Sequence, residues 1–298
     1  MLKTVIKLIV SILLIILLFN KIDMHQLKET IVKVGLFDFL LLCFLYLSAQ
    51  FISSIRWKLV IKSLGKNEDF LSLFKLYLMG MFANLFLPSI IGGDAIKGYI
   101  LSKKIGIRQS ISSIFLERYN GLVALLLLSL ISVLLFFKLF GIKIALSIIS
   151  INIFAFVSVY MLKFIKHKKV SLFYNDIVLF HKSKEFYIVS ALSVFIQIIN
   201  ILIYVCVGQL TNLNINIAYY FAFIPIITLI SFLPISFNGI GVREFSFVYL
   251  FKYAGLSPAQ AVSLSLIVFF VSVACSLIGG VFYLSNGRVV KEAKEFHR

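Results

Sequence analysis

Long apolar runs are the feature that most constrains how this chain can fold. VALLLLSLISVLLFF starts at Val123 and SLIVFFVSVACSLIGGVFYL starts at Ser265, and with their apolar flanks both reach the roughly 20 residues needed to cross a bilayer. Hydrophobic residues make up 61% of the chain and charged residues only 14%, whereas soluble domains contain about 25% charged residues. The sequence therefore predicts an integral membrane protein with no soluble domain between its apolar runs.

Six segments have the length and composition of plain transmembrane helices. They cover about residues 4–19, 37–55, 110–137, 143–163, 186–207 and 259–284. Two further apolar segments, about 70–101 and 217–254, are interrupted by proline, glycine and charged residues. We interpret these two as re-entrant helical hairpins of opposite orientation. The predicted fold is an all-α polytopic bundle of eight apolar segments, forming a single transmembrane domain over residues 1–298.

The net charge of +17 does not indicate a nucleic-acid partner, because the basic residues flank apolar segments, as the positive-inside rule predicts for cytoplasmic loops. With both termini in the cytoplasm, the hairpin topology places twenty of the 29 lysines and arginines inside and six outside. The remaining three, Lys97, Arg118 and Arg243, lie at membrane depth. Two ordinary crossings in each broken segment would preserve the same sidedness.

The two broken segments resemble each other in sequence. LFLPSIIGGDAIKGYIL begins at Leu85 and SFLPISFNGIGVREFSFVYL begins at Ser231, and both run from Phe-Leu-Pro through glycines to an acidic and a basic residue. Because one hairpin enters from each side, this similarity favours an inverted-topology repeat, the architecture that places transporter substrates near the bilayer midplane. Chance similarity between two Pro-Gly loops is the alternative.

The breaks themselves imply a protein-lined or wet environment, since unpaired backbone groups cost several kcal/mol each in lipid. Proline disrupts the incoming arm, while glycine permits a reversal with positive φ and a close approach of other groups. We expect Asp94 to lie in the first turn of a returning helix, Lys97 to reach it at i, i+3, and Asn84 to satisfy exposed carbonyls. The predicted hairpin-break residues are Pro88, Gly92, Gly93, Pro234, Gly239 and Gly241.

Six ionisable residues at membrane depth suggest a binding site for an anionic lipid headgroup. Each costs about 2.5 to 3.5 kcal/mol at the centre of a span on insertion scales, so such residues are functional candidates by default. The alternative is a set of buried ion pairs that hold the hairpins to the bundle. Arg56 and Trp57 are interpreted as interfacial anchors at headgroup level. The predicted substrate-binding residues are Asn84, Asp94, Lys97, Glu117, Arg118, Arg243 and Glu244.

The sequence predicts no catalytic residue, cofactor or metal site. The three scattered cysteines, Cys43, Cys206 and Cys275, have no zinc-site or disulfide-framework spacing. Asp94, Glu117 and Glu244 could ligate a divalent metal, but the bases near them favour ion pairs. The basic stretch from Lys163 to Glu185 is predicted to be a cytoplasmic loop that faces anionic lipid. The four histidines also fall in predicted loops or the tail: His25, His167, His181 and His297.

Several motifs in one order give the chain a family resemblance. They are RW at 56–57, N-x-x-x-P-x-x-x-G-G-D over 84–94, ERYNGL over 117–122, and LP-x(4)-G-x-G-V-R-E over 233–244 followed by GLSPAQAVSLSL. Together they resemble the lysylphosphatidylglycerol synthase transmembrane-region family of flippase-like membrane proteins. The resemblance covers nearly the whole chain. Many members carry an arginine in the last span, where this sequence reads SLIVFFVSVACSLIGG, so a lipid-binding role for that helix is not carried over.

The resemblance implies a multi-pass protein of a prokaryotic cytoplasmic membrane that binds or translocates an anionic lipid or lipid-linked intermediate, such as a phospholipid or polyprenyl phosphate. In larger members a similar region is joined to a cytosolic aminoacyl-transferase domain, for which this sequence has no room. The alternative function is therefore that of a membrane-embedded subunit or enzyme of lipid modification, similar to a phosphatidylglycerol lysyltransferase and needing a separate catalytic partner.

Overall fold

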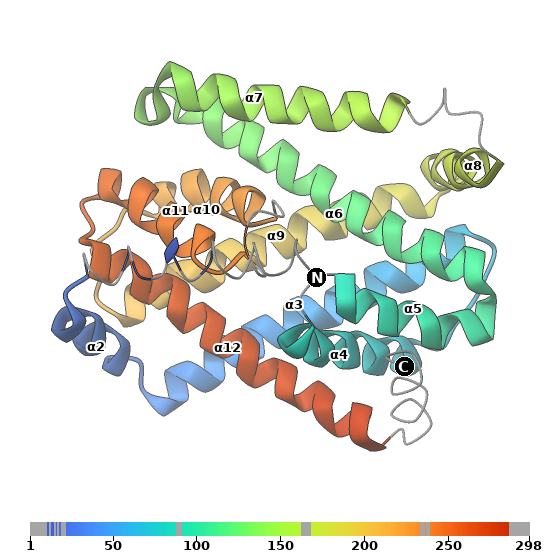
Figure 1. Cartoon of the computed structure of the whole chain (residues 1–298), viewed down its shortest axis with the longest axis horizontal. Coiled ribbons are helices and arrows are strands. Elements are labelled where there is room, and N and C mark those ends of the chain that lie inside the picture. Colours follow the sequence, from blue (N-terminus) through green and yellow to red (C-terminus); the bar gives the residue numbers. More distant parts are fainter. Residues whose placement is uncertain are drawn as a thin grey trace. The chain divides into compact units, whose positions relative to one another are not determined.

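The protein is described here by a computed structural model that defines residues 22–87, 91–161, 168–232, 236 and 239–285, with isolated positions between 11 and 18. Over these ranges the chain forms helices and no strands (Figure 1). The helices are α2 (Met24–Val32), α3 (Leu36–Ser63), α4 (Phe70–Phe86), α5 (Ile91–Ile105), α6 (Ile107–Leu135), α7 (Phe137–Met161), α8 (Lys168–Lys182), α9 (Glu185–Leu210), α10 (Ile217–Ser231), α11 (Val242–Phe251) and α12 (Pro258–Ser285).

Four of the described helices, α3, α6, α9 and α12, are long and apolar enough to cross a membrane. Shorter apolar helices cover Phe70–Phe86, Ala145–Phe154 and Ile217–Ser231. The chain is thus an all-helical multi-pass membrane protein, as the sequence predicted. The predicted first span, about residues 4–19, falls mostly outside the described residues. The number of crossings and the re-entrant course of the broken segments remain predictions.

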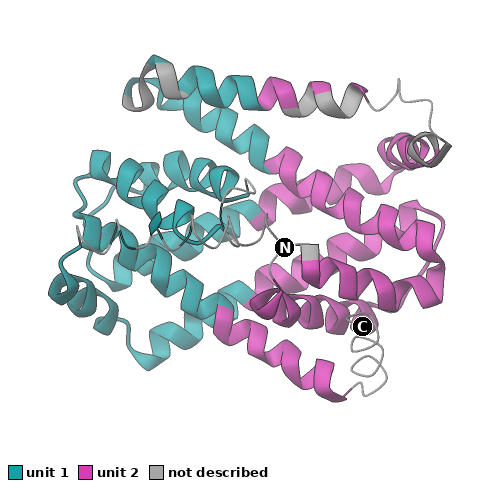
Figure 2. Ribbon diagram, viewed as in Figure 1, with its two compact units in different colours: residues 1–46, 125–151, 197–272 teal, residues 47–124, 152–196, 273–298 magenta. Residues whose placement is uncertain are grey.

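The chain divides into two compact units that interleave along the sequence (Figure 2). Unit 1 comprises Met1–Tyr46, Leu125–Ile151 and Gln197–Ser272, and unit 2 comprises Leu47–Ala124, Asn152–Ile196 and Val273–Arg298. Each unit holds one complete broken segment: α4 and α5 belong to unit 2, and α10 and α11 to unit 1. The long helices α3, α6, α9 and α12 each contribute one part to each unit.

Each broken segment folds as two helices that contact each other, close to the predicted ranges. In the second segment, Gly239 and Gly241 have φ angles of 77° and 85°, which confirms the predicted glycine turn. In the first, the prediction of positive φ is wrong. Gly92 and Gly93 already belong to helix α5 and are not among the positive-φ glycines. Pro88 and Pro234 lie outside the described residues.

Local side-chain bonds explain why several of these helices begin where they do. Asp69 caps α4 by accepting a hydrogen bond from the Ser72 backbone N–H at 2.9 Å. Asn216 caps α10 in the same way, through the N–H of Ala218. Before α12, Ser257 and Gln260 exchange backbone-to-side-chain bonds in a capping box.

Two segments predicted as loops are helical. Residues 24–32 form α2, and most of the basic stretch 163–185 forms α8, so His25 and His181 lie on helices rather than in loops. Both helices are short and carry charged residues, so a search for long apolar runs misses them. His167 and His297 lie outside the described residues.

Candidate functional site

Helices α4 and α5 of unit 2 come together at a glycine contact that positions the charged residues. A Cβ built on Gly93 would lie 2.0 Å from the carbonyl oxygen of Gly80, so the two backbones meet without side chains between them. Asn84 Oδ1 accepts a hydrogen bond from the Gly93 N–H at 2.8 Å. This bond satisfies an amide of the first helical turn; the predicted contact of Asn84 with exposed carbonyls stays a prediction. The contact places the first turn of α5 against α4.

Asp94, in that first turn, joins two cations. Lys97 Nζ lies 2.9 Å from Asp94 Oδ1, which confirms the predicted i, i+3 pair. Arg118 of α6 donates from Nε to Asp94 Oδ2 at 2.8 Å and from Nη2 to Asp94 Oδ1 at 3.1 Å, in a bidentate arrangement. The two cations differ in exposure, because the side chain of Lys97 is 4% exposed and that of Arg118 is 38% exposed.

Lys97 is further confined by aromatic rings. Its Nζ lies 4.4 Å from the ring centroid of Tyr77 and 5.0 Å from that of Trp57. Cation–π contacts of this kind stabilise a desolvated ammonium by about 2 kcal/mol or more. Lys97 is therefore held between Asp94 and two rings, away from solvent.

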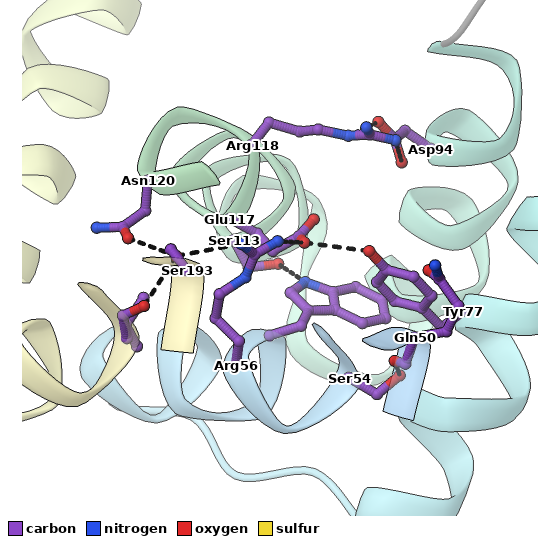
Figure 3. Close-up of polar contacts among 12 residues, drawn as sticks. Gln50, Ser54, Arg56, Tyr77, Asp94, Ser113, Glu117, Arg118, Asn120 and Ser193 are labelled. Atoms are coloured by element: carbon purple, nitrogen blue, oxygen red, sulfur yellow. Dashed lines mark hydrogen bonds and ion pairs between the residues drawn. The ribbon is translucent and has the colours of Figure 1, made fainter. Parts of the chain in front are cut away.

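A second ion pair joins α3 to α6, where Arg56 Nη2 bonds to Glu117 Oε1. Tyr77 Oη donates to the same Glu117 oxygen at 3.3 Å. Figure 3 shows the neighbouring residues Glu117 and Arg118 directed to different partners. This separation agrees with the sequence argument that adjacent helical residues must pair with different elements. Glu117 Oε2 is buried and has no hydrogen-bond partner in the part of the chain that the structure describes.

Hydroxyl and amide groups that sequence reasoning did not select extend this network across α3, α6 and α9. Arg56 Nη1 donates to Ser193 Oγ at 3.1 Å, and Ser193 Oγ donates to Asn120 Oδ1 at 2.7 Å. Trp57 Nε1 donates to Ser113 Oγ at 3.2 Å. Among these hydroxyl and amide residues, only Asn120 stood out in the sequence, because it lies within the ERYNG motif inside an apolar run. Arg56 and Trp57 lie in the buried interior of unit 2, and their depth relative to lipid headgroups stays a prediction.

Unit 1 contains a separate, smaller cluster at the start of α11. Arg243 donates from Nη2 to Glu244 Oε1 at 2.6 Å and from Nε to Ser265 Oγ of α12 at 2.8 Å. Glu244 Oε2 accepts the Gly241 N–H at 2.7 Å, which caps the helix. The Arg243 guanidinium also lies 5.2 Å from the ring centroid of Phe269. Arg243 and Glu244 thus lie in the first turn of α11, the second helix of this broken segment, and neutralise each other.

The two clusters differ in charge balance. In unit 2 the three cations Arg56, Lys97 and Arg118 face two carboxylates, Asp94 and Glu117. In unit 1 one arginine faces one glutamate. We assign the excess positive charge of unit 2 to its partly exposed member, Arg118, whose Nη1 has no bonding partner among the described residues. Over the same residues, no group of three or more His, Cys, Asp or Glu is arranged to hold a metal ion.

Comparisons with known proteins identify relatives over most of the chain. The UPF0104 membrane protein MJ1595 of Methanocaldococcus jannaschii is 34% identical over 119 residues, which are 39% of this chain and 35% of that protein. The UPF0104 membrane protein MJ1078 of the same organism is 27% identical over 235 residues, 72% of this chain and 98% of that protein. A family model described as the lysylphosphatidylglycerol synthase TM region matches residues 4–280. The chain therefore belongs to the lysylphosphatidylglycerol synthase transmembrane-region family.

Proposed function

We propose that this protein binds an anionic lipid or lipid-linked intermediate through its phosphate and translocates it across the cytoplasmic membrane, with Arg118 as the phosphate-binding residue. The observation that carries the proposal is the uncompensated charge of the unit 2 cluster, concentrated on a partly exposed guanidinium. A guanidinium presents five donors, and Asp94 occupies only Nε and Nη2 of Arg118. The remaining donors suit a phosphate oxygen.

The other members of the cluster hold Arg118 in place. Asp94 fixes the plane of its guanidinium with two bonds, and Lys97 neutralises Asp94, so the carboxylate does not cancel the charge of Arg118. Asn84 supports the site indirectly through Gly93. The pair of Arg243 and Glu244 in unit 1 is electrically balanced, so we assign it a supporting role in the fold of hairpin 2 (α10 and α11).

The lengths of the hairpin helices support an interior location for the site. At 1.5 Å per residue, the 15 residues of α5 span about 22 Å and the 10 residues of α11 about 15 Å. Both are shorter than the roughly 30 Å hydrocarbon core. A helix that starts within the membrane brings its amino-terminal charges to lipid depth, where a transported headgroup passes.

The test is lipid translocation in vesicles that contain the purified protein and one fluorescent lipid: phosphatidylglycerol, phosphatidylcholine or a polyprenyl phosphate. Arg118→Gln should slow translocation of the anionic lipids about tenfold or more, because one charged hydrogen bond contributes about 1.5 to 3 kcal/mol. It should leave folding intact, since Asp94 keeps its pair with Lys97. Arg118→Lys should retain part of the activity.

The matched control is Arg108→Gln, which removes an arginine that pairs with Asp176 outside the cluster. It should translocate lipid as the wild type does. A folded Arg118→Gln variant with wild-type rates for all lipids would contradict the proposal. Chemical turnover of the lipid by the purified protein would instead favour the lipid-modification function.

A further inference from the structure

Helix α8 differs from every spanning helix of unit 2 in direction, length and surface. In Figure 1 it is seen nearly along its axis, whereas α5 and the unit 2 part of α6 run across the view. Its 15 residues cover about 22 Å, too little for the roughly 30 Å hydrocarbon core. A helix lying across the spans, rather than along them, runs in the plane of the membrane.

One face of α8 is anchored in unit 2. Ile177 and Phe180 are buried in a core with Val60, Leu116 and Val189. Asp176 accepts from Arg108 Nη2 at 2.6 Å and from Ser112 Oγ at 2.6 Å. The anchor fixes the rotation of α8 about its own axis and therefore decides which residues face outward.

The outward face carries two exposed leucines, with the exposed Asn175 between them along the chain, and exposed lysines follow at its carboxyl end. Leu172 and Leu179, two turns apart, are 37% and 57% exposed. Lys182 and Lys184 are exposed at the carboxyl end, and neither has an ion-pair partner among the described residues. The nearby acids are already occupied, because Asp176 is paired with Arg108 and Glu185 with Lys62. Two exposed leucines with exposed lysines beside them are complementary to the acyl-headgroup boundary of an anionic leaflet.

We propose that α8 is an in-plane interfacial helix that inserts Leu172 and Leu179 just below the headgroups and binds anionic phospholipid through Lys182 and Lys184. This proposal is independent of the translocation site at Arg118. The exposed Tyr187, at the start of α9, lies next along the chain and has the amphipathic ring typical of the same boundary. The headgroup-binding surface is thus held rigidly on the transmembrane unit.

Depth measurements on the full chain test the insertion. With Cys43, Cys206 and Cys275 replaced, single nitroxide labels are placed at residues 172, 179 and 175, and at 195 within the span α9. In bilayers, labels at 172 and 179 should collide more with oxygen than with a water-soluble nickel complex, and should lie shallower than the label at 195. The label at 175 should favour the nickel complex. Labels at 172 and 179 that are water-exposed, as for a soluble partner, or as deep as 195 overturn the proposal.

The lipid preference is tested with the same label at 179. Adding phosphatidylglycerol to phosphatidylcholine bilayers should deepen the label, since each basic residue contributes about 1 kcal/mol near an anionic surface, which is about fivefold in an equilibrium. Lys182→Gln combined with Lys184→Gln should abolish this lipid-dependent shift. Lys138→Gln, an exposed lysine on α7, should leave the shift unchanged. A shift that persists without Lys182 and Lys184 overturns their role.

Discussion

Arg56 and Glu117 are an ion pair in the interior of unit 2, with side-chain exposures of 7% and 1%. Removing one member leaves the other charge buried and unpaired, which costs about 3 to 5 kcal/mol. We therefore expect Glu117→Leu and Arg56→Met each to lower the unfolding midpoint of the purified protein in detergent, and the double variant to recover most of the loss. A double variant as unstable as the worse single one would contradict this expectation.

The charged residues of unit 2 show which parts of the site can be predicted from residue type alone. Glu117 and Arg118 were recognisable because charges inside an apolar run are costly. Their partners depend on how helices are rotated against each other, which is not encoded in local sequence. Arg56 was interpreted as an interfacial anchor because it ends a predicted apolar run, whereas α3 continues past it to Ser63. Ser193 gave no signal, since isolated serines are common in transmembrane helices.

At the element scale, hairpin 1 (α4 and α5) depends on the contact between Gly80 and Gly93. A methyl group on Gly93 would overlap backbone atoms, which cannot move aside as a side-chain end can. Gly93→Ala should therefore destabilise the protein by about 1 to 3 kcal/mol or more, measured as a lower unfolding midpoint, and should reduce lipid translocation by displacing Asp94.

Gly98→Ala, on the same helix, is the control for the Gly93 substitution. Its new Cβ would meet the end of the Ile114 side chain at 3.0 Å and Ser110 Oγ at an ordinary contact distance of 3.8 Å. Alanine also favours helix over glycine by about 1 kcal/mol. It should be neutral or mildly stabilising. If both substitutions behave alike, the backbone contact at Gly93 is not what holds the hairpin.

The start of α4 should be sensitive to acid. The backbone N–H of Ser72 donates to the Asp69 carboxylate and holds its pKa below the ordinary value of 3.8. A depressed pKa means that the stabilisation is present above about pH 4 and is lost as the pH falls below it. Amide exchange in the first turn of α4 should accelerate over that range, and Asp69→Asn, which caps without ionising, should remove the pH dependence. An unchanged pH profile in Asp69→Asn would show that another group is responsible.

Helices were predictable from the sequence where a long apolar run, or its interruption by proline and glycine, was the dominant pattern. The broken segments were found to within a few residues because proline and glycine interrupt strongly apolar runs. The amphipathic helices α2 and α8 were missed because their polar residues resemble loop residues until the apolar face is considered. The predicted conformation of Gly92 and Gly93 was wrong for a related reason, because glycine suits both positive φ and close approach of a neighbour. The packed neighbours, Leu87 for Gly92 and Gly80 for Gly93, show that close approach is what the fold uses.

At the scale of the whole molecule, the order of elements repeats. A long helix, two short helices and a second long helix occur as α3, α4, α5 and α6, and again as α9, α10, α11 and α12. This order supports the proposed inverted repeat, in which the two short-helix pairs enter from opposite faces. Such a repeat would also account for the presence of one complete broken segment in each unit.

The inverted repeat makes a topological prediction that single cysteines can test in sealed vesicles or cells, on a background with the native cysteines replaced. Lys66→Cys and Ile107→Cys flank the first broken segment and should both react with a membrane-impermeant reagent from the cytoplasmic side, because each segment returns to its starting face. Asn214→Cys and Tyr253→Cys flank the second and should both react from outside, while the basic loops remain inside. If the two flanks of either segment label from opposite sides, that segment crosses the membrane once. The predicted asymmetry of lysines and arginines between the two sides would then be broken, which would contradict the inverted repeat.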